Sequence, residues 1–197
     1  MRITAALGLL LILAACGQVG PAADPAANAT SPVAGSAASG PRFSQPPVTP
    51  PTAPTTSPPP FACANSGGGK TGVANVTAVR VSEQPGYDRF VLQFDGAVPT
   101  YTVKRQPKPT FTLGGSGQSI TLSGTSGALV TVHSATETNS YSGPTDISHP
   151  EFLVIKEARL TQDFEGSVSW ALGLDHAACL RTFTLANPAR LVVDFAT

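Results

Sequence analysis

The stretch that decides the fold is Val76-Thr77-Ala78-Val79-Arg80-Val81, followed closely by Arg89-Phe90-Val91-Leu92-Gln93-Phe94. The first segment alternates in the period-two pattern of a β-strand that buries one face. Between the two segments, Pro85-Gly86-Tyr87-Asp88 is a turn sequence, and Asp95-Gly96 marks another turn directly afterwards. The pattern predicts a β-hairpin.

Working outward from this hairpin, similar short runs recur between residues rich in Gly, Pro, Asn and Ser. Further strands are predicted at 101–104, 119–122, 128–133, 152–155, 167–172, 181–185 and 190–195. No stretch of this region has a long apolar period of 3.6 residues, so helices are not expected. About nine short strands with these turns are typical of an all-β protein, a sandwich or barrel, and we expect a small sandwich.

The beginning of the chain has a different character. Arg2 is followed by an apolar run, Ile3 to Leu13, which is too short to cross a bilayer and fits a secretory signal peptide at residues 1–15. Leu13-Ala14-Ala15-Cys16-Gly17 resembles the bacterial lipobox, in which the cysteine is acylated after cleavage. We therefore expect an exported protein that Cys16 anchors by lipid to the extracytoplasmic face of a membrane.

Residues 16–62 are dominated by Pro, Ala, Ser and Thr. This composition buries too little apolar surface to offset the entropy of ordering. The tract Gln45–Pro54 and the run Pro58-Pro59-Pro60 favour extended polyproline II. The sequence thus predicts a disordered tether at 16–62 and one domain at 63–197.

Two cysteines remain once Cys16 is lipidated, Cys63 and Cys179. Thiols of an exported chain meet an oxidising compartment in which paired cysteines persist. We expect a Cys63–Cys179 disulfide that joins the start of the domain to a strand near its end.

Composition excludes several other functions. The chain is formally neutral and has no basic stripe, so nucleic acid is not an expected partner. His133, His149 and His176 lack the spacing of metal ligands, and neither a metal nor another cofactor is expected. Gly67-Gly68-Gly69-Lys70-Thr71 imitates a phosphate-binding loop, but a proline tract precedes it and we interpret it as flexible linker.

The closing segment Asn187-Pro188-Ala189-Arg190-Leu191-Val192-Val193-Asp194 resembles the last strand of AMIN domains, which are β-sandwich modules of bacterial envelope proteins. With Gly86-Tyr87-Asp88-Arg89, Asp95-Gly96 and Asp163-Phe164-Glu165-Gly166, the fuller match is to the AMIN-like domain of bacterial lipoproteins, over most of Val76 to Phe195. The resemblance implies a sandwich that acts in the cell envelope.

In the closing strand, Leu191 and Val193 are expected on one face, with Arg190, Val192 and Asp194 on the other. Phe164 is expected to plug the edge of the core. Trp170 and Tyr101 are expected in the core or on a sheet face, with stacking on a glycan as the alternative if either is exposed.

The candidate binding residues are Asp88, Arg89 and Tyr101, where a hairpin rim projects from the end of a sandwich. For Asp88 and Arg89, ion pairing that stabilises a turn or rim is the competing interpretation. We expect a non-enzymatic module that binds peptidoglycan, another wall polymer or an envelope protein. A small-ligand-binding lipoprotein is the alternative, and an envelope hydrolase is a third hypothesis.

Overall fold

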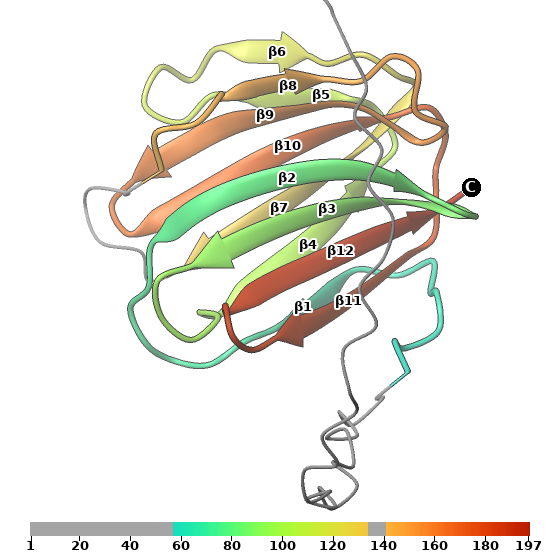
Figure 1. The fold of residues 1–197 in the computed structure, drawn as a ribbon. Coiled ribbons are helices and arrows are strands. Elements are labelled where there is room, and N and C mark those ends of the chain that lie inside the picture. Colours follow the sequence, from blue (N-terminus) through green and yellow to red (C-terminus); the bar gives the residue numbers. More distant parts are fainter. Residues whose placement is uncertain (1–56, 134–140) are drawn as a thin grey trace, which may run out of the picture. The chain divides into compact units, whose positions relative to one another are not determined.

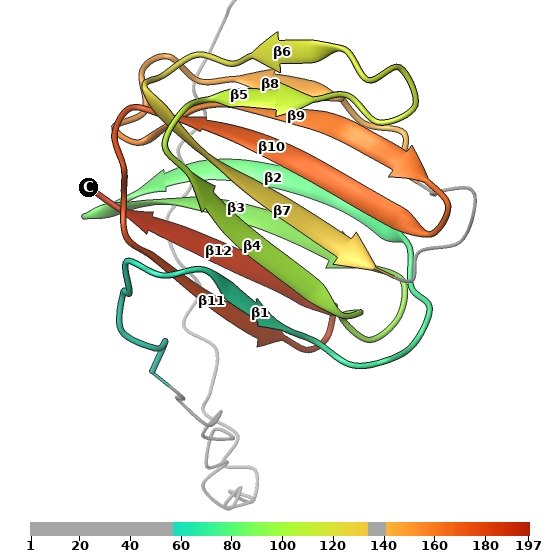
Figure 2. The same cartoon turned by 180° about the vertical axis from the view of Figure 1, so that it is seen from behind.

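Two antiparallel sheets face each other and bury the core between them (Figures 1 and 2). The computed structural model describes residues 57–133 and 141–197 and forms twelve strands from them. The predicted signal peptide (1–15), Cys16 and the tether as far as residue 56 lie outside the described residues. No described segment is a helix long and apolar enough to cross a membrane. The predicted all-β class is confirmed, with more strands than the nine or so expected.

The first sheet has four strands in the order β11-β12-β3-β2. These strands are β2 (Val76–Gln84), β3 (Tyr87–Phe94), β11 (Leu180–Leu185) and β12 (Arg190–Ala196). The hairpin β2–β3 is the one that the opening sequence pattern predicts. Strand β12 inserts between β3 and β11, so the end of the chain becomes a central strand of the sheet.

The second sheet has six strands in the order β1-β4-β7-β10-β9-β8. These strands are β1 (Ser66–Gly68), β4 (Tyr101–Gln106), β7 (Ser126–His133), β8 (Asp146–Ser148), β9 (Ile155–Phe164) and β10 (Ser167–Leu174). A separate hairpin, β5 (Thr110–Thr112) with β6 (Ser119–Thr121), brings Phe111 against Ala171 of β10. The hairpin therefore helps to cover part of the outer face of the six-stranded sheet.

Alternating residues of the facing strands fill the core. In β3 the burial pattern alternates strictly, with Phe90, Leu92 and Phe94 buried. Trp170 is fully buried on β10, and its ring lies 6.0 Å from that of Phe90 across the two sheets. Leu191 and Val193 point inward beside Phe90 and Leu92, as the sequence pattern predicts.

Three local expectations are wrong. The Gly67–Thr71 stretch is not a free linker, because Gly67 and Gly68 belong to β1 and pair with β4. Residues 152–154 are not strand; β9 begins at Ile155 and continues to Phe164. Phe164 does not plug the edge of the core: it is 59% exposed, because the last two residues of β9 are both exposed to solvent.

The N-terminal part of the domain is fixed to β11 at several points. The predicted disulfide between Cys63 and Cys179 is confirmed. Ala62 forms a β-bridge with Leu180, and the Phe61 ring packs against the guanidinium of Arg181. Phe61 and Ala62, which lie within the segment predicted to be tether, therefore contact the sandwich, and all described residues belong to one compact unit.

Candidate functional site

The candidate site lies on the outer face of the four-stranded sheet. Because side chains alternate along a strand, Arg89 points away from the core while its neighbours Asp88 and Phe90 point into it. Arg89 on β3 lies opposite Asp194 on β12, which in turn lies opposite Arg181 on β11. One row across three strands therefore reads Arg–Asp–Arg, and we call Tyr87, Arg89, Arg181 and Asp194 the arginine–aspartate cluster.

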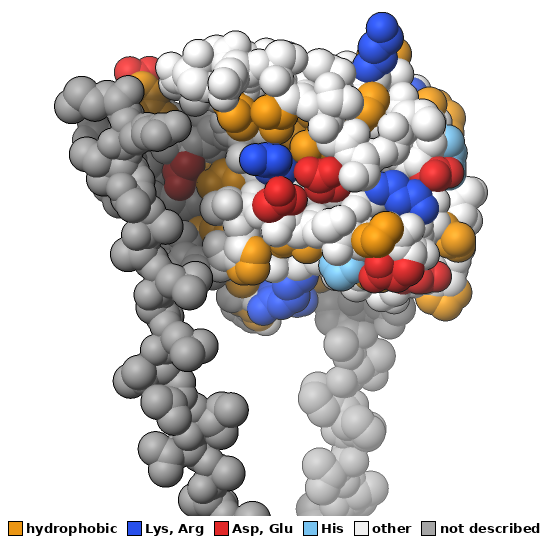
Figure 3. Space-filling view, turned by 90° about the horizontal axis from the view of Figure 1, so that it is seen from above, with side chains coloured by type: hydrophobic (Ala, Val, Ile, Leu, Met, Phe, Trp, Pro, Cys, Tyr) orange, Lys and Arg blue, Asp and Glu red, His pale blue; other side chains and the backbone are white. Residues whose placement is uncertain are grey.

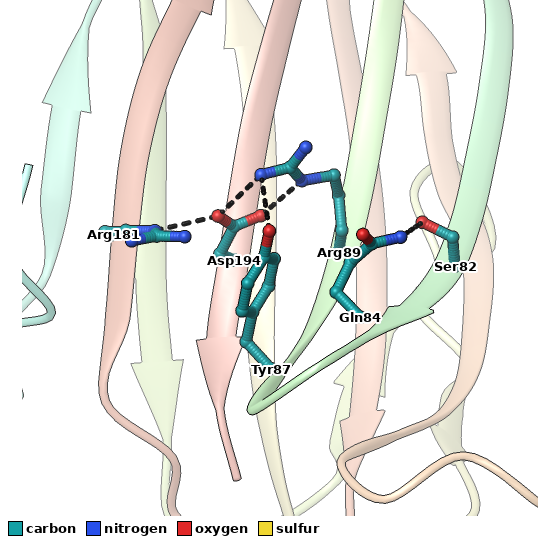
Figure 4. A network of polar contacts seen from close by, with 6 residues as sticks. All are labelled: Ser82, Gln84, Tyr87, Arg89, Arg181 and Asp194. Atoms are coloured by element: carbon teal, nitrogen blue, oxygen red, sulfur yellow. Dashed lines mark hydrogen bonds and ion pairs between the residues drawn. The ribbon is translucent and has the colours of Figure 1, made fainter. Parts of the chain in front are cut away.

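Hydrogen bonds hold this cluster rigidly (Figure 4). The Nε and Nη2 atoms of Arg89 donate to the two carboxylate oxygens of Asp194 at 2.7 and 3.0 Å. The Nε atom of Arg181 donates to the same carboxylate at 2.8 Å, and Arg89 also donates to the Tyr87 hydroxyl at 3.2 Å. The two-point contact with Arg89 fixes the orientation of the carboxylate as well as its position.

Aromatic rings enclose both guanidinium groups. The guanidinium carbon of Arg181 lies 4.4 Å from the centre of the Phe61 ring and 4.8 Å from that of Tyr87. The guanidinium carbon of Arg89 lies 5.2 Å from Tyr87 and 5.5 Å from Phe183. Such cation–π contacts restrict the arginine rotamers, so the site is ordered before any ligand arrives.

Burial differs across the cluster. The Asp194 side chain is fully buried, whereas those of Arg89 and Arg181 are 25% and 15% exposed. The hydrogen bonds to Asp194 raise the pKa of Arg89 above its ordinary value, against the opposing effect of burial. One carboxylate between two guanidinium groups leaves one positive charge in excess at the surface.

Asp88 has a different role from Arg89, its neighbour in the sequence. Its fully buried carboxylate faces the second sheet, where Oδ2 accepts the backbone N–H groups of Val154 and Ile155 at 2.7 and 2.8 Å. These N–H groups lie at the beginning of β9, so Asp88 of the four-stranded sheet fixes the position where a strand of the six-stranded sheet begins. A buried carboxylate in this position is structural.

Tyr101 also lies in the interior. It is 4% exposed on β4 of the six-stranded sheet, and its hydroxyl donates to Thr182 of β11 at 3.3 Å. The structure therefore does not bring Asp88, Arg89 and Tyr101 together, and of these three only Arg89 reaches the surface. Ligand contact by these residues stays a prediction. The sequence analysis missed Arg181 and the aromatic rings, because no local pattern shows that β11 and β3 lie in the same sheet. Asp194 in the closing motif was the one residue of the sequence that could have pointed to a charged partner.

Other groups offer little chemistry. His149 pairs with Glu151 at 3.0 Å, and His176 lies 3.7 Å from Asp175; neither contact involves a serine or cysteine nucleophile. Within residues 57–133 and 141–197 no group of three His, Cys, Asp or Glu side chains is placed to hold a metal ion. The arginine–aspartate cluster holds two guanidinium groups in fixed positions, and arginine is too basic to exchange protons at neutral pH.

Fold and site together define a β-sandwich domain with an ordered cluster of two arginines around one buried aspartate on the outer face of one sheet. The family model of the AMIN-like domain matches residues 74–197, and the chain belongs to the AMIN-like domain family. Membership indicates a domain associated with the bacterial cell envelope, on the extracytoplasmic side. A comparison with curated proteins found no match.

The family motifs now have a physical meaning in this chain. Within Gly86-Tyr87-Asp88-Arg89, Asp88 ties the two sheets together, and Tyr87 and Arg89 belong to the cluster. The closing motif supplies Asp194, the partner of Arg89. Two motifs separated by about half of the chain therefore meet in one ion pair.

Proposed function

We propose that this chain is a lipid-anchored envelope protein whose β-sandwich binds an envelope component without catalysing a reaction. Cys16 carries the anchor, and residues 17–60 act as a spacer between the anchor and the domain. The outer face of the four-stranded sheet is the binding surface, with Arg89 and Arg181 as its fixed points.

The observation that carries this proposal is the ordering of the arginine–aspartate cluster. Stability alone requires one positive charge beside buried Asp194, yet the cluster supplies two guanidinium groups. Here aromatic rings hold two part-exposed guanidinium groups in place. Fixing donors before binding reduces the entropy lost on association, which favours recognition.

Co-sedimentation with purified cell-wall sacculi tests binding. The chain from Gly17 to Thr197 is expected to pellet with sacculi, with a modest affinity of about micromolar Kd. An Arg89→Ala variant, shown to be folded by circular dichroism, is expected to pellet less. Equal pelleting of the variant would remove Arg89 from the binding surface, and the absence of pelleting by the parent would contradict wall binding.

A separate measurement tests the proposal that the domain catalyses no reaction. The same chain, incubated with sacculi and with chromogenic esters, is expected to release no more soluble product than buffer does. Heat-denatured chain is the matched control for contaminating activity. Product that accumulates in proportion to the concentration of folded chain would establish a hydrolase instead.

A further inference from the structure

The outer face of the four-stranded sheet carries a local excess of positive charge, although the formal net charge of the whole chain is zero. Its charged strand residues are Arg80 on β2, Arg89 on β3, Arg181 on β11, and Arg190 and Asp194 on β12. Glu83 lies opposite Asp88 in the register and so belongs to the other face. The face therefore has four arginines against one carboxylate, and that carboxylate is buried beneath two of them.

The edge of the sandwich near β8 and β9 lacks this bias. Figure 3 shows acidic and basic side chains next to one another at the edge near β8 and β9. There Arg159 pairs with Asp146 at 3.4 Å, and Lys156 lies 3.7 Å from Asp175. The positive excess therefore belongs to one face of the sandwich and does not follow from overall composition.

The charges on this face are arranged in rows. Arg181, Asp194 and Arg89 form one row across the sheet, and Leu185, Arg190 and Gln93 form another two rows further along. The row between them is apolar over three strands, with Phe183, Val192 and Val91, before Arg80 at the edge. Neighbouring rows of one face are about 7 Å apart, so the arginines extend over roughly 14 Å.

We propose that this face binds an anionic wall polymer in which phosphate groups alternate with sugar or polyol units. The inference rests on the proposed function and names its ligand. Guanidinium groups pair with phosphate through two parallel hydrogen bonds. The arginines occupy three successive rows, with Arg80 at the edge of the middle one, so they can engage anionic groups that repeat along a chain, whereas one small anion would engage only one row.

The test uses poly(glycerol phosphate) as the probe and the chain from Gly17 to Thr197. Arg80→Gln/Arg190→Gln is the informative variant, because neither residue supports buried Asp194. Lys104→Gln/Arg159→Gln is the control, since it removes the same charge from the outer face of the six-stranded sheet. We expect the first variant to bind about tenfold or more weakly than the parent and the control to bind within about twofold. Binding by the parent is expected to weaken steeply as salt is raised.

Sacculi distinguish this inference from the proposed function. The parent is expected to pellet with untreated sacculi and less with sacculi stripped of phosphate polymers by hydrofluoric acid. Equal pelleting with both preparations, or equal probe binding by both double variants, would overturn the inference and leave wall binding intact. A parent that binds neither preparation overturns both. Binding to vesicles of anionic phospholipid, without binding to the probe, would assign the face to a membrane and contradict the inference.

Discussion

Arg89 and Asp194, which are 105 residues apart in the sequence, face each other directly on β3 and β12 and share two hydrogen bonds of 2.7 and 3.0 Å. Arg181 donates a third bond to the same buried carboxylate. Because a buried carboxylate needs a compensating charge, either arginine can still neutralise Asp194 when the other is removed. This redundancy leads to a specific expectation for their substitution.

Replacing either arginine alone, as Arg89→Gln or Arg181→Gln, is expected to lower the free energy of unfolding by only about 1 kcal/mol, since the other arginine still neutralises Asp194. The double variant is expected to lose about 3–5 kcal/mol because it leaves a buried charge unpaired. Urea denaturation measures all three. Adding Asp194→Asn to the double variant is expected to restore much of the loss. Strictly additive single effects, with no rescue, would contradict this account.

Asp88 provides the second prediction. Asp88→Ala is expected to lower the free energy of unfolding by about 2–4 kcal/mol, because it leaves two buried N–H groups without an acceptor. Asp95→Ala is the matched control: Asp95 also accepts a backbone N–H, from Asn75, but in an exposed position where water replaces it. That variant is expected to lose less than about 1 kcal/mol. Similar losses in both variants would show that burial does not set the cost.

The third prediction concerns the disulfide. Cys63 and Cys179 are separated by 116 residues, so their bond closes a long loop. Cys63→Ser/Cys179→Ser is expected to lower the free energy of unfolding by about 2–5 kcal/mol. Thermal melting follows the effect, and reducing agent is expected to lower the melting temperature of the parent but not that of the double variant. If reducing agent affects both equally, the bond is not the cause.

The fourth prediction concerns the proposed spacer, residues 17–60. A chain that starts at Ser57 is expected to melt at the same temperature as one that starts at Gly17. A chain that starts at Ala62 is expected to lose about 0.5–1 kcal/mol, because Phe61 no longer packs on Arg181. Phe61→Ala in the longer chain is expected to reproduce that loss. A large difference between the Gly17 and Ser57 chains would show that the preceding tract packs on the domain.

The last prediction concerns the proposed lipid anchor at Cys16. Cys16→Ser, expressed in the native host, is expected to move the protein from the membrane fraction to the soluble fraction, because a chain without its acyl groups has no anchor. Cys63→Ser/Cys179→Ser is the control for loss of a cysteine as such and is expected to stay with the membrane. Retention of the Cys16→Ser variant in the membrane fraction would place the anchor elsewhere.

The sequence was informative wherever alternation was regular. The strands β2, β3, β10 and β12 follow from period-two patterns. Strand β9 was largely missed because its pairing with β10 shifts register between Ser169 and Trp170, which interrupts the alternation. Strands β1, β5 and β8 have three residues each and were missed, whereas the equally short β6 lies in the predicted segment 119–122.

By itself, the sequence determined the all-β class, the hairpin around Gly86, the faces of the closing strand and the pairing of Cys63 with Cys179. Each depends on local periodicity, or on there being two cysteines left to join. Only the tertiary structure showed what the adjacent residues Asp88 and Arg89 do on the two faces of one sheet. Asp88 accepts hydrogen bonds from the second sheet in the interior, whereas Arg89 pairs with Asp194 on the outer face. The tertiary structure also decided that Arg181 meets Arg89 over Asp194. Strand order causes this: inserting β12 between β3 and β11 brings distant residues into one row, and no local pattern encodes which strand becomes the neighbour.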